Sequence, residues 1–185
     1  KGSFAGGLIR LNQADRVIIN GSYAGSGNYL IFNNKYTTAA ASAIHVSDFG
    51  STTNGSTDVV IKNCTFTGPS LPSSNSIALT GLSVGGSTVN SNGGNHHNMV
   101  IDSNSFKSLR YGMYIANNYG RVQENLKIRY NTIGSQDGSI RYTGIYLGGA
   151  NKAIVSYNKF NNISSGVAYS AGTGIYISGS TTQGF

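Results

Sequence analysis

The acidic side chains are the first candidates for chemistry, because hydrolysis or elimination on a sugar chain needs acid and base groups that converge on one place. The six acids are isolated from one another along the chain: Asp15, Asp48, Asp58, Asp102, Glu124 and Asp137. Only Asp102 lies in the middle of an apolar run, where its side chain should face outward. The sequence therefore predicts no pair of catalytic carboxyl groups.

Asp102 has basic counterparts in the runs that resemble its own. Lys62 and Arg129 occupy the equivalent position, so strands stacked in register would form a Lys-Asp-Arg row with steps of about 4.8 Å. In an enzyme, Arg129 or Lys62 could act as the base beside a calcium-bound uronate. Calcium takes about six to eight oxygen ligands, however, and one carboxylate does not supply them. We expect a surface charge ladder, without a catalytic residue, metal or cofactor.

The cysteine and two adjacent histidines are better explained as structural. Cys64 is the only cysteine, and it lies at an apolar point of a strand pattern, which predicts a buried, inert thiol. His96 and His97 lie in a loop rich in Gly and Asn, with no further ligand at metal-binding spacing. We expect ordinary loop histidines. Motifs for a serine nucleophile or a phosphate-binding loop are lacking in the sequence.

Three tyrosines share one short motif and are the candidate ligand-binding residues. Each lies between two apolar residues, and if those point inward, the alternation of a strand forces the tyrosine outward. The three are Tyr114, Tyr146 and Tyr176. Such a stripe suits contact with sugar rings or a protein partner, while the alternative is an aromatic ladder that only stabilises the fold. Tyr130 and Tyr157 form a similar pair on another side.

The elements that must position these residues are short β-strands. Runs of β-branched and aromatic residues recur between Gly, Ser and Asn turns, and no window of about ten residues shows a helical period. The chain contains 26 glycines and only 10% charged residues, yet it has 12 tyrosines. Disordered chains are poor in such aromatic and β-branched residues. We therefore predict an all-β fold.

Two sets of runs alternate along the chain. The first set aligns without gaps on Ile19, Ile61, Ile101, Ile128 and Val155, with spacings of 42, 40, 27 and 27 residues. The second set contains the Gly-Ile-Tyr motifs. Each run resembles its distant equivalents rather than its neighbours, which favours stacked repeats with a shared core over hairpins. The sequence thus predicts a parallel β-helix solenoid.

A column of corner residues is expected three positions after the aligned isoleucines. These residues are Cys64, Asn104, Asn131 and Asn158. Asn side chains there can bond to backbone groups that a bend leaves unpaired, and stacked Asn amides can bond to one another. A residue that recurs once per repeat in this way is expected to be structural.

The charge argues against two classes of partner. The net charge of +7 comes from 13 basic and 6 acidic residues, and the basic residues are scattered rather than clustered as on a nucleic-acid-binding face. No stretch approaches the roughly 18 apolar residues of a membrane span. We expect neither nucleic-acid binding nor membrane insertion. A diffuse attraction to acidic glycans or anionic surfaces fits this charge.

The repeats carry a family resemblance. Two runs, Ile128-Arg-Tyr-Asn-Thr-Ile and Val155-Ser-Tyr-Asn-Lys-Phe, alternate with Gly-Ile-Tyr-Leu and Gly-Ile-Tyr-Ile. This pattern resembles the right-handed parallel β-helix repeats of the pectin-lyase-like superfamily over nearly the whole chain. The opening run from Leu8 to Gly21, with Asn131-Thr-Ile-Gly and Asn161-Asn-Ile-Ser, is similar to β-helical segments of large surface proteins secreted by Bacteroidetes. The resemblance implies a right-handed solenoid of about five or six coils.

The resemblance also implies a function and a location. We expect a noncatalytic structural or adhesive segment of a large secreted bacterial cell-surface protein, which contacts a polysaccharide or cell-surface glycan through the tyrosine stripe. The alternative within the superfamily is a polysaccharide lyase or glycoside hydrolase that uses Asp102, Arg129 and Lys62. Residues 1–185 should form a single segment of a longer chain, with adjoining coils of that chain as further partners, because strand patterns begin almost at Lys1.

Overall fold

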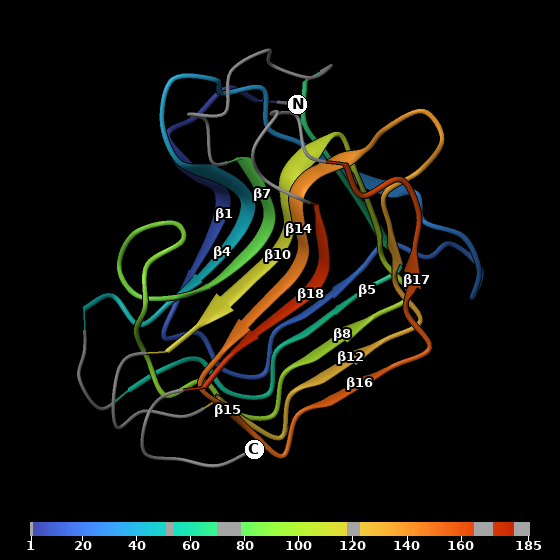
Figure 1. Ribbon diagram of the computed structural model, residues 1–185. Coiled ribbons are helices and arrows are strands. Elements are labelled where there is room, and N and C mark those ends of the chain that lie inside the picture. The colour runs from blue at the N-terminus through green and yellow to red at the C-terminus, as the bar shows by residue number, and fades with distance from the viewer. Residues whose placement is uncertain (1, 51–53, 70–78, 118–122, 165–171, 180–185) are drawn as a thin grey trace.

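Strands from distant parts of the chain lie side by side in the computed structural model shown in Figure 1. The structure describes residues 2–50, 54–69, 79–117, 123–164 and 172–179. Within these ranges there are strands but no helix, and all pairs of named strands are parallel. The chain is all-β, with parallel strands in stacked sheets, and this arrangement is consistent with a β-solenoid.

The largest sheet contains six long strands that curve together across the molecule (Figure 1). In spatial order they are β1 (Gly6–Asn12), β4 (Ala41–Ser47), β7 (Leu79–Gly85), β10 (Leu109–Ala116), β14 (Ile140–Gly148) and β18 (Thr173–Ser178). Spatial order follows chain order, and other strands intervene in the sequence between each pair. Each strand of this sheet therefore belongs to a separate repeat.

Two further sheets have five short strands each. The first contains β2 (Ile18–Asn20), β5 (Val60–Lys62), β8 (Val100–Asp102), β12 (Lys127–Arg129) and β16 (Ile154–Ser156). The second contains β3 (Leu30–Asn33), β6 (Cys64–Thr67), β9 (Ser105–Lys107), β13 (Thr132–Ile133) and β17 (Lys159–Phe160). A small pair joins β11 (Gln123–Glu124) to β15 (Ala150–Asn151).

The aligned isoleucines set the register of the first five-stranded sheet. Ile19 pairs with Ile61, Ile61 with Ile101, Ile101 with Ile128, and Ile128 with Val155. The three middle side chains are completely buried. The alignment predicted from the sequence is confirmed, because loops of different length join strands of constant pattern.

Asparagines form a ladder at the corner between the two five-stranded sheets, as expected. The Asn131 amide nitrogen donates to the carbonyl oxygen of Ile101 at 3.0 Å and to Asn158 Oδ1 at 2.9 Å. Asn131 Oδ1 in turn accepts from the backbone N–H of Asn104 at 2.9 Å. Asn104 Oδ1 accepts from the backbone N–H of Cys64, whose buried thiol has its pKa raised to about 11 by that burial. The predicted burial of this cysteine is confirmed.

Glycines allow neighbouring repeats to approach closely within the long strands. A Cβ atom on Gly112 would lie 2.5 Å from the carbonyl oxygen of Gly144, and a Cβ atom on Gly144 would lie 2.6 Å from the carbonyl oxygen of Gly174. Neither Gly112 nor Gly144 has a positive φ. The glycines that precede Met113 and Ile145 are therefore needed for space rather than for an unusual backbone conformation.

Candidate functional site

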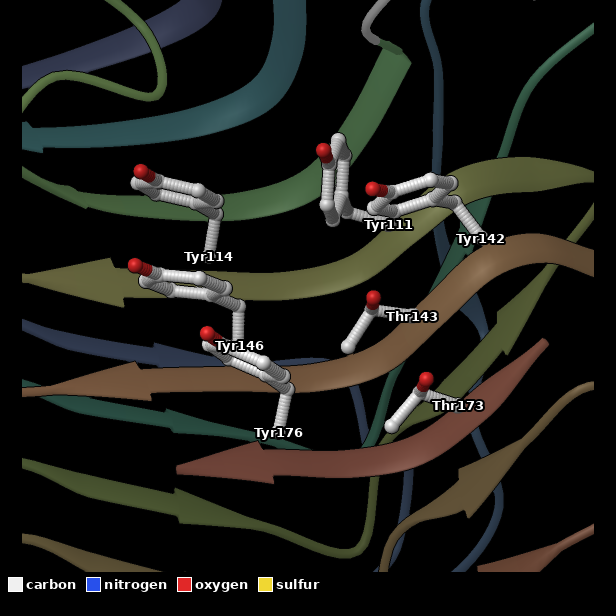
Figure 2. A pocket seen from close by; sticks show the side chains of 7 residues that line it. All are labelled: Tyr111, Tyr114, Tyr142, Thr143, Tyr146, Thr173 and Tyr176. Atoms are coloured by element: carbon white, nitrogen blue, oxygen red, sulfur yellow. The ribbon is translucent and has the colours of Figure 1, made fainter. Parts of the chain in front are cut away.

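The three candidate tyrosines stack on one another across the long sheet (Figure 2). Tyr114 pairs with Tyr146 and Tyr146 with Tyr176, so the rings lie on β10, β14 and β18. Ring centroids are 4.4 Å apart for the first pair and 5.2 Å for the second, with interplanar angles of 5° and 17°. Met113 and Ile145, which precede two of the tyrosines, are completely buried. The stack expected from the motif is present, but Ile175 and Ile177, which flank Tyr176, are exposed rather than buried as the motif predicted.

The stacking determines which parts of the tyrosine rings a ligand can contact. Because the ring faces of Tyr146 lie against Tyr114 and Tyr176, a ligand at the centre of the stripe meets ring edges and hydroxyl groups. Tyr114 and Tyr146 are half-buried, while Tyr176 is 48% exposed. Burial, reinforced by the neighbouring Tyr146, raises the pKa of Tyr114 to about 12. The Tyr114 phenol is therefore an uncharged hydrogen-bonding group at neutral pH.

A hollow of about 340 Å³ adjoins the stripe. Figure 2 shows the tyrosine stack on the left, with Tyr111 and Tyr142 to its right at the level of Tyr114, and the two threonines below them. Its lining residues are Tyr111, Tyr114, Tyr142, Thr143, Tyr146, Thr173 and Tyr176. We call this site the tyrosine hollow. Its volume lies at the small end of the roughly 300–1,000 Å³ typical of small-molecule sites.

A bulge in β14 places one of the added tyrosines. Leu109 pairs with Ile140 but Tyr111 pairs with Thr143, so β14 contains one more residue than β10 over this stretch. Such a bulge re-aims side chains locally, and Tyr142, inside it, lines the hollow and is 38% exposed. Tyr111 and Tyr142 were not predicted from the sequence, because the extra residue breaks the alignment of the repeats upstream of the glycine.

Arg110 lies against the two added tyrosines. Its guanidinium carbon is 5.5 Å from the ring centroid of Tyr111 and 5.0 Å from that of Tyr142, both within cation–π range. The Tyr111 ring also meets the rings of Tyr114 and Tyr142 edge-on, with centroid distances of 5.6 and 5.3 Å. These contacts hold Tyr111 at the junction of the stripe and the bulge.

The alternative catalytic row is formed, but on another sheet. Lys62 pairs with Asp102, and Asp102 with Arg129, in the sheet of β5, β8 and β12. Arg129 Nη2 donates to Asp102 Oδ2 at 2.8 Å. The hydroxyl of Ser103 donates to Asp102 Oδ1 at 2.6 Å. Both carboxylate oxygens are thus already bonded, as expected for a charge ladder, and the tyrosine hollow lies on the six-stranded sheet instead.

The two adjacent histidines differ from each other. His96 is completely buried, its Nδ1 accepts the backbone N–H of Ser56 at 2.9 Å, and its Nε2 lies 3.0 Å from the carbonyl oxygen of Gly85. The ring is therefore neutral with its proton on Nε2, and His96 is a structural loop histidine, as expected, although its side chain is buried. His97 is partly exposed and lies 3.7 Å from a carboxylate oxygen of Glu124. Among the described residues, no three metal-ligating side chains gather.

No protein-family model, curated protein or solved structure matched this chain. In the ranges that the structure describes, no helix is long and apolar enough to cross a membrane. The function must therefore be inferred from the geometry of the tyrosine hollow and of the charged row.

Proposed function

We propose that this chain is a noncatalytic, adhesive segment that contacts a glycan through the tyrosine hollow. The observation that carries the proposal is the hollow itself, in which five tyrosines and two threonines from neighbouring strands converge. Phenol and threonine hydroxyls both donate and accept hydrogen bonds, as sugar hydroxyls do. Tyrosine edges supply apolar contact with little conformational entropy to lose. Such a surface binds sugars without needing acid or base groups.

The scaffold in this proposal is a right-handed parallel β-helix of five or six coils, of the pectin-lyase-like kind. The two sheets of five strands and the one of six support that number of coils. Right-handedness is supported by the strong preference for right-handed crossovers between parallel strands of one sheet, about 98% of cases. A crystal structure would test both features, and left-handed winding would contradict the proposal.

The location in this proposal is the surface of a bacterial cell, as part of a longer secreted protein whose adjoining coils stack on this segment. Its support is the similarity of the repeats to surface proteins of Bacteroidetes. An antibody raised against the segment should label intact cells of the source bacterium. Labelling only after the cells are broken would contradict this location.

Glycan binding is tested by an array probed with two proteins. The parent chain should bind at least one glycan class, and the Tyr114, Tyr146 and Tyr176 triple alanine variant should lose that binding while remaining folded. A double alanine variant at Tyr130 and Tyr157 is the matched control, because those rings also stack, at 5.0 Å, and are more than half exposed. Equal binding by the triple variant and the parent would reduce the stripe to a structural ladder.

The rival function is that of a lyase or hydrolase acting through Asp102, Arg129 and Lys62. Incubation with polygalacturonate, alginate and neutral glycans, with and without calcium, should give no turnover. Turnover that disappears in Asp102→Ala or Arg129→Ala would replace our proposal with the enzyme.

A further inference from the structure

We propose that the tyrosine hollow selects an uncharged sugar, and that Tyr142 and Thr143 are the residues that determine this specificity. The inference rests on the proposed function and names the ligand class for the same site. It is carried by the lining of the hollow, by its shape and by the bulge in β14, none of which depends on the family resemblance.

The lining of the hollow contains no charged side chain among the described residues. All seven residues that line it are tyrosine or threonine. The adjacent cation, Arg110, directs its guanidinium at the rings of Tyr111 and Tyr142. A carboxylate that entered the hollow would lose hydration, and no residue of the lining carries a charge to pair with it, which is costly. Because none of the lining residues is charged, the hollow favours a neutral ligand.

The shape of the hollow follows from a change of residue size within one column of the sheet. Tyr111 pairs with Thr143, and Thr143 pairs with Thr173. The large ring in β10 is thus followed by two short side chains in β14 and β18, and the space between them and the tyrosine stack is the hollow (Figure 2). Two strand spacings amount to about 10 Å, which gives room for about one or two sugar rings.

The hydrogen-bonding groups of the hollow suit sugar hydroxyls. Thr143 is buried, with 3% of its surface exposed, yet it lines the hollow together with Thr173. The phenol of Tyr142 reaches the same hollow because the bulge inserts it there. A protein hydroxyl can donate a hydrogen bond to a sugar hydroxyl or accept one from it. A lining of arginine or lysine would instead favour acidic sugars.

The first test is isothermal titration calorimetry with matched ligands. Trigalacturonate carries a carboxylate on each ring where trigalactose carries a neutral hydroxymethyl group. Trisaccharides of glucose and mannose serve as further neutral ligands. At least one neutral trisaccharide should bind about tenfold more tightly than trigalacturonate. Its affinity should change little between about 50 and 500 mM salt, because no ion pair is screened. Tighter, salt-sensitive binding of trigalacturonate would overturn the inference but leave glycan binding intact.

The second test uses variants with the best neutral trisaccharide. Tyr142→Ala and the nearly isosteric Thr143→Val should each weaken binding about tenfold, whereas Tyr157→Ala, outside the hollow, should not. Thermal unfolding of each variant checks that it is folded. If folded Tyr142→Ala and Thr143→Val bind the trisaccharide normally while the Tyr114, Tyr146 and Tyr176 triple alanine variant does not, this inference is overturned but the proposed function stands. Binding of no glycan in any arm would overturn the proposed function as well.

Discussion

Asn131 shows how one side chain can join three repeats. It is completely buried, it bonds to the backbone carbonyl of Ile101 and to Asn158, and it receives the backbone N–H of Asn104. Alanine there would remove the partner of two backbone groups of the preceding repeat, the carbonyl of Ile101 and the N–H of Asn104, and a buried group left unpaired costs about 1–3 kcal/mol. We expect Asn131→Ala to lower the free energy of unfolding by about 2–5 kcal/mol, measured by urea denaturation.

Asn158 is the matched control for this prediction. It makes the equivalent bond to the carbonyl oxygen of Ile128 at 2.8 Å, but it is only partly buried. Water can therefore replace part of the hydrogen bonding that alanine removes. Asn158→Ala should lower the free energy of unfolding less than Asn131→Ala does. Equal losses in the two variants would show that burial does not set the strength of the ladder.

His45 should make the stability of the chain depend on pH. Burial, together with the charge of Arg10 on β1, lowers its pKa from 6.5 to about 4, against the opposing effects of the Gly86 carbonyl and Asp48. Between those two pH values the unfolded chain binds a proton that the folded chain does not, so stability falls as pH decreases from 6.5 to about 4. The shift corresponds to about 3 kcal/mol. Urea denaturation at several pH values measures this loss.

The control for the pH prediction is His45→Gln. Glutamine does not titrate, so the variant should lose stability less steeply between pH 6.5 and 4. His96 is also buried, and its pKa is lowered chiefly by that burial. The stability of the variant should therefore still fall as the pH decreases, but less than that of the parent. Identical pH profiles for the variant and the parent would contradict the assignment to His45.

The packing of the long strands depends on glycine at position 144. Alanine at Gly144 would place its Cβ atom 2.6 Å from the carbonyl oxygen of Gly174 and 2.9 Å from the ring of Phe160, so neighbouring repeats would have to separate. We expect Gly144→Ala to lower the free energy of unfolding by about 1–3 kcal/mol. Gly148→Ala, whose Cβ atom would meet its nearest neighbour at 3.5 Å, should change stability little. A larger effect at Gly148 than at Gly144 in thermal unfolding would contradict this explanation.

The register of each sheet could be predicted from sequence where one residue type recurs at the same point of every repeat. The isoleucine column and the Gly-Ile-Tyr motifs recur in this way, and the structure pairs them as aligned. The bulge at Tyr142 could not be predicted in this way. One inserted residue changes which side chains alternate locally, and the insertion does not recur in the other repeats. The burial of His96 depends on a loop that packs on Gly85 and Ser56, which periodicity does not describe.

At the scale of the whole molecule, the tyrosine hollow and the pair formed by Asp102 and Arg129 lie on different sheets. The tyrosine hollow occupies the six-stranded sheet, whereas Asp102 and Arg129 pair on the five-stranded sheet. A sugar held in the hollow would therefore contact hydroxyls and ring edges rather than the acid and base candidates. This separation supports binding without turnover and makes the hollow the part of the molecule on which the proposed function depends.

The most direct test of glycan contact at the hollow is an NMR titration of protein with isotope-labelled tyrosine rings. The chain has 12 tyrosines, and single substitutions assign their signals. On addition of the best neutral trisaccharide, signals of Tyr114, Tyr142 and Tyr146 should shift together and saturate, while those of Tyr130 and Tyr157 stay unchanged. Shifts confined to Tyr130 and Tyr157, or no tyrosine shift at a ligand concentration that saturates binding, would contradict the account.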